Sequence, residues 1–172
     1  MIDQPIKRGP IKHGMPPIAR GDARLFILGS LPGDASLAAR RYYAHPTNQF
    51  WRLLGGTICE DLQGRPYEER LACLASRRIG LWDVVASAAR RGSLDQAIRG
   101  ADHNSLASLS SDFPDLEAIA FNGKAAALAG RRLLPGGAGV ALIDLPSSSA
   151  ANTTALTDKL AAWSALAKFC GA

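Results

Sequence analysis

Four short apolar runs, spaced along the chain with helical stretches between them, constrain the fold of this sequence more than any other feature. The runs span residues 23–28, 79–85, 116–121 and 139–145. Each has the length and the nearly unbroken apolar character of a strand that is buried on both faces. Strands that alternate with helices need crossover connections, which build a mostly parallel sheet with helices on both sides. The sequence therefore predicts one three-layer α/β/α sandwich around a central, mostly parallel four-stranded sheet.

Helical patterns fill the intervals between these runs and follow the last one. Apolar residues recur at helical spacing at Phe50, Leu53 and Leu54, and similar patterns occur over residues 66–77, 124–134 and 152–169. Asn152 or Thr153 is a suitable N-cap for the long closing helix.

Length and composition limit what kind of protein this is. A chain of 172 residues has the size of one compact domain. Residues 1–22 carry basic residues and prolines but no apolar signal-peptide core, so we expect an extended arm before a single domain over residues 23–172. No apolar run approaches the roughly 20 residues that cross a bilayer. The net charge of +5 favours an anionic partner such as nucleic acid.

The cysteine pattern bears on compartment and cofactors. The three cysteines show no CxxC spacing and no arrangement in pairs, which argues against a disulfide framework and against an iron–sulfur cluster. Reduced thiols are typical of cytoplasmic proteins. We therefore expect a cytoplasmic protein without such a cluster.

The predicted fold also locates the site, because ligands of open α/β sheets bind beyond the carboxyl ends of the strands. The first strand runs into Gly29-Ser30-Leu31-Pro32-Gly33, where glycine lets the backbone turn sharply and approach a ligand. The same residues also suit an ordinary turn. This loop lacks the lysine and Ser/Thr of a nucleotide P-loop, so nucleoside-triphosphate binding is not expected.

An aromatic segment follows, over residues 42–51. Pro46 suits the first turn of a helix, which would place Asn48 near the positive end of the helix dipole. An amide there can orient a water molecule or bind the polar edge of a base, or it can simply cap the helix. The clustered rings offer flat surfaces on which an extruded base can stack, although Phe50 and Trp51 could equally fill the core.

The later strand ends add an amide, a serine-rich loop and basic residues. Asn122 carries both donors and an acceptor, so it can read the Watson–Crick edge of a base, or it can cap the following helix. The loop over residues 146–152 can hold phosphates through hydroxyl and backbone N–H groups, unless it is only a linker. Among four pairs of adjacent arginines, Arg90-Arg91 is the best placed to touch a DNA backbone.

Taken together, these motifs resemble the DNA-deoxyinosine (hypoxanthine-DNA) glycosylases of the uracil-DNA glycosylase superfamily. They are similar also to the mismatch-specific uracil/thymine DNA glycosylases, which share a His-Pro…Asn…Phe-Trp segment. The residues that carry the resemblance lie in the expected order: 29–33 through Ser36-Leu37, Tyr42-Tyr43-Ala44-His45-Pro46, Asn48-Gln49-Phe50-Trp51, 80–84, Ser93-Leu94-Asp95, Phe121-Asn122-Gly123 and 145–149.

The resemblance implies an α/β/α sandwich that flips a damaged base out of double-stranded DNA and hydrolyses its N-glycosidic bond. It assigns catalysis to Asn48, and base binding to Gly29, Ser30, Leu31, Pro32, Gly33, Phe50 and Asn122, and we add His45 as a second catalytic residue. We assign DNA contacts to Arg90, Arg91, Lys124, Pro146, Ser147, Ser148, Ser149, Ala150 and Asn152. Water positioned by Asn48, with help from His45 or the Leu31 backbone, is the expected nucleophile. We expect a monomer that needs no metal or other cofactor and does not cleave the strand.

Two departures from the relatives shape the expected substrate, a deaminated or mismatched base. Leu31 stands where the mismatch-specific enzymes have an asparagine, and leucine cannot hydrogen-bond a water molecule. Hypoxanthine is therefore favoured over uracil or xanthine. The final loop has Ser149-Ala150-Ala151 where relatives often place a proline after the serines, which leaves the residue that wedges into the duplex unassigned.

Two other functions fit parts of the same sequence. An esterase could use Ser30 as nucleophile and His45 as base, but the chain lacks a nucleophile-elbow motif. A catalytically inactive module that binds damaged DNA is the other alternative, suggested by Leu31.

Overall fold

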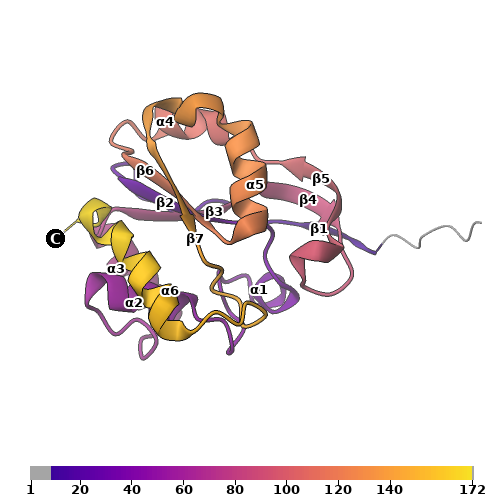
Figure 1. The fold of residues 1–172 in the computed structure, drawn as a ribbon, viewed down its shortest axis with the longest axis horizontal. Helices are drawn as coiled ribbons and strands as arrows, with labels where there is room; N and C mark the ends of the chain where they lie inside the picture. Colours follow the sequence, from indigo (N-terminus) through magenta and orange to yellow (C-terminus); the bar gives the residue numbers. More distant parts are fainter. Residues whose placement is uncertain (1–8, 172) are drawn as a thin grey trace, which may run out of the picture.

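A computed structural model describes residues 9–171, and a four-stranded parallel sheet forms its centre (Figure 1). The strands are ordered β3-β2-β6-β7, and their bounds are Leu25–Gly29 for β2, Ile79–Asp83 for β3, Ala118–Asn122 for β6 and Ala141–Leu145 for β7. Every neighbouring pair is parallel. Every residue of β2 and β6 is buried, because these strands hold the middle of the sheet. Each predicted run contains one of these strands, but the prediction of burial on both faces is wrong for β7, because it lies at the edge of the sheet.

Helices cover both faces of this sheet (Figure 1). One face is covered by α2 (Phe50–Ile58), α3 (Tyr67–Ser76), α6 (Leu156–Trp163) and a 3₁₀ segment, Ser164–Phe169. The other is covered by α4 (Leu109–Asp112), α5 (Lys124–Leu133) and a 3₁₀ turn, Leu106–Ser108. A separate apolar cluster lies on each side of the sheet. The predicted three-layer α/β/α sandwich is confirmed.

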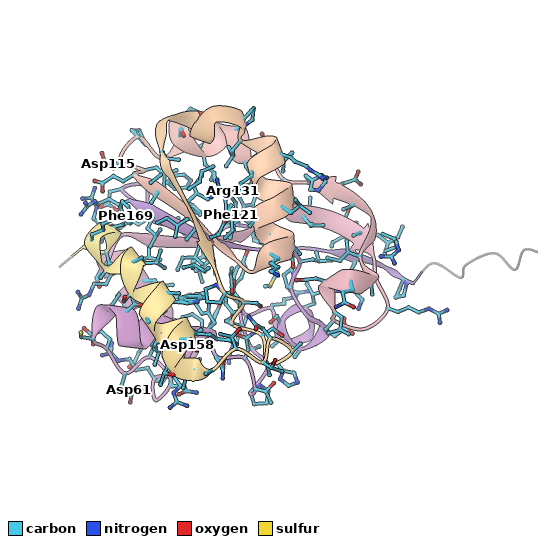
Figure 2. The ribbon with its side chains drawn as sticks, in the orientation of Figure 1. Asp61, Asp115, Phe121, Arg131, Asp158 and Phe169 are labelled. Carbon is cyan, nitrogen blue, oxygen red and sulfur yellow. The ribbon has the colours of Figure 1, made fainter. Side chains whose placement is uncertain are left out.

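Close packing of α5 on the sheet depends on a glycine. Gly130 lies over the ring of Phe121, and a Cβ at that position would come within 2.1 Å of the ring. Arg131, on the same helix, places its guanidinium 6.0 Å from the centre of the Phe121 ring (Figure 2). This packing lets α5 lie close against β6.

A second, antiparallel sheet was not expected from the sequence. It has the order β1-β4-β5, with bounds Ile11–His13 for β1, Val85–Ala89 for β4 and Arg99–His103 for β5. The apolar run over residues 79–85 is therefore not one strand, because Val84 lies between β3 and β4 and the chain then enters the second sheet. Strands this short, with few large apolar residues, give little sequence signal.

The described part of the N-terminal arm lies against the rest of the molecule. Residues 1–8 lie outside the described residues. From residue 9 onward, β1 pairs with β4, and Ile18 forms an isolated antiparallel bridge with Leu81 of β3. The hydroxyl of Tyr42 donates a hydrogen bond of 2.9 Å to the Pro16 carbonyl. None of the helices in the described part of the chain is long and apolar enough to cross a membrane.

Two predicted helix starts are wrong. Helix α2 begins at Phe50, so Pro46 and Asn48 precede the helix instead of forming its first turn. Helix α6 begins at Leu156, because the Asn152 carboxamide oxygen accepts hydrogen bonds from the Thr154 N–H and hydroxyl and holds a separate turn. Neither Asn152 nor Thr153 caps that helix, and its last turns are 3₁₀ from Ser164 onward.

Candidate active site

A cavity of about 450 Å³ opens where the carboxyl ends of the parallel strands meet the second sheet. Four segments that are distant in the sequence line it, together with Asp83 and Asn122: residues 29–36, 42–48, 93–96 and 147–152. Helix α1 (Asp34–Ala39) begins at its edge. All five residues of the first loop lie in its wall. A second cavity of about 530 Å³ lies between the arm and α1, and Tyr42 lines both cavities.

The aromatic wall of the cavity is Tyr43 and not Phe50. Phe50 is fully buried, and its ring stacks on that of Tyr43 with the centroids 3.8 Å apart and the planes inclined by 6°. Trp51 and Trp163 pack their edges against Phe50. Tyr43 is half-buried and lines the cavity, whereas Phe50 does not. The prediction that a base stacks on Phe50 is wrong for this conformation, because Tyr43 covers that ring.

The backbone of Tyr43 is unusual for a bulky residue. Its φ of 53° lies in the left-handed region. A non-glycine residue held there costs about 1–3 kcal/mol, and such residues concentrate at functional sites. The conformation is held by surrounding contacts, which include the indole N–H of Trp51 donating to the Tyr43 carbonyl at 3.2 Å.

Asn48 and Asn122 meet through Ser148, which is almost fully buried. The Asn122 Nδ2 group donates to the Ser148 hydroxyl at 2.8 Å, and that hydroxyl donates to Asn48 Oδ1 at 2.9 Å. The Ser148 N–H returns a hydrogen bond of 2.8 Å to Asn122 Oδ1. A further contact of 3.2 Å joins Asn122 Nδ2 to the Tyr43 hydroxyl. The structure thus brings three predicted site residues together on one wall. The predicted DNA contact of Ser148 is wrong, because its side chain is buried and joins Asn48 to Asn122.

The hydrogen bonds of Asn48 limit what its side chain can do. Its Oδ1 accepts from both Ser148 and the Phe50 N–H, the latter at 2.9 Å. Its Nδ2 group has no acceptor among the described residues. Asn48 can therefore donate a hydrogen bond to a bound molecule, while its oxygen is already engaged.

His45 lies at the mouth of the cavity and is exposed. The Thr47 N–H donates to His45 Nδ1 at 3.2 Å, and the Thr47 hydroxyl lies 2.8 Å from the same nitrogen. Because a backbone N–H can only donate, Nδ1 is the acceptor, and the ring hydrogen of a neutral His45 resides on Nε2. Ser30 donates instead to Asp95 Oδ1, at 2.5 Å. The Ser30–His45 hydrogen bond on which an esterase would depend is absent from the described structure.

Arg90 has a different position from the one predicted. It is fully buried and does not line the cavity. Its guanidinium donates to the Leu31 carbonyl at 3.0 Å and to the Pro32 carbonyl. The prediction that Arg90 touches the DNA backbone is therefore wrong for this conformation. Arg90 instead supports the 29–33 loop through its hydrogen bonds to two backbone carbonyls. Leu31 turns its side chain into the apolar cluster of the second sheet, beside Val85 and Ala88.

The loop over residues 147–152 forms one rim of the cavity and is anchored by Lys159. This lysine is fully buried, and its Nζ donates to Gln49 Oε1 at 2.9 Å, to the Ser149 carbonyl at 3.3 Å and to the Asn152 carbonyl at 2.9 Å. Burial lowers the pKa of its ammonium group. Ser147, Ser149, Ala150 and Asn152 reach the cavity, whereas Pro146 lies behind it with its carbonyl bonded to Trp163.

The opposite rim is the connection between β4 and β5, which the sequence did not assign to the DNA interface. It includes a 3₁₀ turn, Asp95–Ala97, and the side chain of Leu94, which is 56% exposed. Arg91 and Lys124, two predicted DNA contacts, are exposed but lie outside the cavity wall.

Asp83 is a further cavity residue, besides Tyr43 and the connection between β4 and β5, that the sequence did not identify. It ends β3, is only 3% exposed and lines the cavity. Burial, with a smaller contribution from Asp95, raises the pKa of its carboxyl group to about 7. The signal was available, since an acidic residue inside an otherwise apolar strand is rarely buried without a reason. Among residues 9–171, no three His, Cys, Asp or Glu side chains gather as metal ligands would.

Comparison with known proteins agrees with this geometry. Residues 16–167 match the family model of the uracil DNA glycosylase superfamily. A protein of Methanosarcina acetivorans named hypoxanthine DNA glycosylase is 40% identical over 91% of this chain and 98% of its own length. A protein of the same name from Methanosarcina barkeri is 45% identical over 66% of this chain and 72% of its own length.

A solved structure is similar as well. It is a solution NMR structure of a candidate uracil DNA glycosylase from Methanosarcina acetivorans. That structure superposes with a TM-score of 0.82 at 39% identity, covering 92% of this chain and 98% of the other.

Proposed function

This chain belongs to the uracil DNA glycosylase superfamily and is a DNA N-glycosylase, and we propose that the base it removes from double-stranded DNA is hypoxanthine. One observation carries the proposal. Asn48 and Asn122 are joined by the buried hydroxyl of Ser148, the Tyr43 hydroxyl contacts Asn122, and all three residues line a single cavity. The two relatives named hypoxanthine DNA glycosylase support this choice of base.

The first step is extrusion of the nucleotide, since a base inside the stack cannot be reached. A mispaired base costs less to extrude than a paired one, which already favours inosine over adenosine. The extruded purine stacks on Tyr43, whose other face is supported by Phe50. Stacking of a base on an aromatic ring contributes about 1–3 kcal/mol.

Recognition of the base depends on Asn122. Its Oδ1 already accepts the Ser148 N–H, and a carbonyl oxygen has a second lone pair. Hypoxanthine carries a hydrogen on N1 that this lone pair can accept, whereas N1 of adenine carries none. Uracil and xanthine share such an N–H group and are weaker alternative substrates in this proposal. Leu31 offers no polar side chain to assist uracil removal.

Cleavage of the C1′–N9 bond leaves positive charge on the sugar and negative charge on the departing base. Hydrogen-bond donors that the folded protein already holds in place stabilise the negative charge on the base. Such electrostatic stabilisation is usually the main source of an enzyme's rate enhancement. The free Nδ2 group of Asn48 donates to one lone pair of the attacking water, whose other lone pair forms the new bond to C1′, and His45 assists at the cavity mouth. The proton that this water loses passes to the departing base, which leaves as neutral hypoxanthine. No lysine is among the described residues that line the cavity, which supports water as nucleophile and an intact DNA strand.

Contact with the duplex is assigned to the two rims and the exposed cations. Arg91, Lys124 and the loop over residues 147–152 hold phosphates, giving salt-sensitive affinity. Leu94 is the proposed wedge, because apolar side chains are the usual wedges between base steps and the 147–152 loop offers only small ones. We further propose that the enzyme is a cytoplasmic monomer, in keeping with its free cysteines.

Base release from defined duplexes tests the function. Duplexes that contain hypoxanthine, uracil, xanthine or adenine at one position are incubated with excess enzyme, and abasic sites are cleaved with alkali. We expect fast release of hypoxanthine and none of adenine. Asn48→Ala should slow release by about 10²–10³-fold, the usual loss for one donor of this kind.

Gln63→Ala is the matched control, because Gln63 is an exposed amide away from the cavity. Full activity of Asn48→Ala would refute the catalytic assignment, and release of no deaminated base would refute the function.

A further inference from the structure

The cavity contains a carboxyl group that the proposed mechanism does not use. Asp83 Oδ2 is completely enclosed and has no hydrogen-bond partner among residues 9–171. Its other oxygen, Oδ1, lies beside Gly29, where a side-chain carbon would come within 2.6 Å of Oδ1 and 3.2 Å of the Tyr43 hydroxyl. Because Gly29 has no side chain, Oδ1 and the Tyr43 hydroxyl adjoin the same space at the base of the cavity.

The surroundings of Asp83 favour a neutral carboxyl group. Arg90 is the cation that acts to lower the pKa of Asp83, but its two terminal nitrogens donate to the Leu31 and Pro32 carbonyls, and its buried Nε, like Asp83 Oδ2, has no hydrogen-bond partner among residues 9–171. Asp95 is a second anion on the adjoining rim, and the Tyr42 and Tyr43 hydroxyls lie nearby. An unpaired buried carboxylate is strongly unfavourable, and the group takes up a proton instead.

We propose that protonated Asp83 donates a hydrogen bond from Oδ1 to an acceptor atom of the extruded purine, which makes Asp83 a further catalytic residue of this reaction. The inference rests on the proposed function. A purine offers ring nitrogens and a carbonyl oxygen as acceptors, and all gain electron density as the C1′–N9 bond breaks. The O–H donor stabilises that charge, whereas an ionised Asp83 would repel it. The hydrogen bond requires no net transfer of a proton.

A pH profile of single-turnover base release tests this role. In the wild type we expect the rate to be constant at low pH and to fall by about tenfold per pH unit once Asp83 ionises, with a midpoint near 7 or above. Asp83→Asn places an amide donor there at every pH, so its rate should lose this alkaline decline. Asp83→Ala removes the donor and should be slower by about 10–100-fold at low pH.

A matched control and a second measurement complete the design. Asp102→Asn removes an exposed carboxylate of β5 outside the cavity and should retain the wild-type profile. The Asp83 carboxyl carbon can also be followed by ¹³C NMR in the free wild-type enzyme, with Asp83→Asn to assign the signal. It should titrate near pH 7, even if Asp83→Ala fails to fold.

The outcomes separate the two proposals. Release of no hypoxanthine at any pH refutes the proposed function and this inference with it. Normal release with an unchanged alkaline decline in Asp83→Asn refutes the role of Asp83 alone. A rate that rises with pH and is abolished in Asp83→Asn would identify Asp83 as a base and overturn its role as a donor, as would titration of its carbon below about pH 5.

Discussion

Tyr43 satisfies several requirements with one side chain. Its ring stacks on Phe50, its hydroxyl contacts Asn122, and its backbone adopts a left-handed conformation that few tyrosines adopt. Desolvation raises the pKa of its phenol, so the hydroxyl keeps its proton and remains a hydrogen-bond donor. At the scale of residues, the site is therefore assembled around one aromatic side chain that joins the apolar core to the polar wall.

Substitutions at Tyr43 should separate the ring from the hydroxyl. Tyr43→Phe keeps the stack on Phe50 and should retain most of the activity. Tyr43→Ala removes the platform and should slow base release by about 10–100-fold, in line with the energy of one base–aromatic stack. Single-turnover kinetics over a range of enzyme concentrations would measure this. If the two variants lose activity equally, the ring is not the platform.

At the scale of elements, the two rims of the cavity differ in how they are held. The 147–152 loop is held by hydrogen bonds from the buried Lys159 of α6. The connection between β4 and β5 projects from the second sheet. One rim is small and ordered by a buried cation, and the other carries an exposed leucine. With this difference between the rims, the 147–152 loop is suited to contact the DNA backbone, and Leu94 is suited to enter the base stack.

Lys159→Met tests the anchored rim. The substitution keeps an unbranched side chain of similar length but removes the donor to Gln49, Ser149 and Asn152. We expect faster amide hydrogen exchange over residues 149–153 and base release slower by about tenfold, because a donor bonded to three acceptors is lost. Lys168→Met, an exposed lysine near the end of the same helical segment, is the control. Unchanged exchange in Lys159→Met would mean that the loop is ordered by other contacts.

Leu94→Ala tests the opposite rim. If Leu94 fills the gap left by the extruded nucleotide, its truncation should slow release from a duplex by about tenfold. Release from single-stranded DNA, where no stack needs to be opened, should not change. Leu128→Ala is a matched control, since Leu128 is 63% exposed and lies on α5 outside the cavity. Equal losses on both substrates would exclude a wedge.

At the scale of the whole molecule, the cavity forms because two sheets meet at one edge. The parallel sheet delivers Gly29, Asp83 and Asn122 at the carboxyl ends of its strands. The antiparallel sheet supplies the second rim, and Arg90, just after β4, holds the first loop in place. The burial of Asp83 between these sheets also couples the stability of the fold to pH.

The sign of this coupling follows from the pKa values. The pKa of Asp83 is raised from 3.8 to about 7 in the folded protein, so between these values the folded state holds a proton that the unfolded state has lost. The free energy of unfolding should therefore fall as pH rises through this window, by up to about 1.4 kcal/mol per unit from this group, and level off above it.

Urea denaturation of the wild type and of Asp83→Asn, from about pH 4 to about pH 8, would measure this contribution as the difference between the two proteins. Other carboxylates such as the half-buried Glu60, whose pKa is lowered by Arg77 and Arg65, act in the opposite sense, but they cancel in that difference. A difference that does not change with pH would show that Asp83 is not protonated in the folded state.

The sequence by itself determined the four parallel strands, the layered fold and the edge at which the site lies. These follow from local patterns, since an apolar run long enough for a strand has few alternatives and parallel strands end on one side. It also identified Asn48, Asn122 and the first loop as cavity residues. Only the tertiary structure decided that Tyr43 covers Phe50, that Arg90 is buried behind the loop, and that Asp83 lacks a partner. Each of these depends on which distant segment packs against the residue. A local sequence pattern contains no information about such long-range packing.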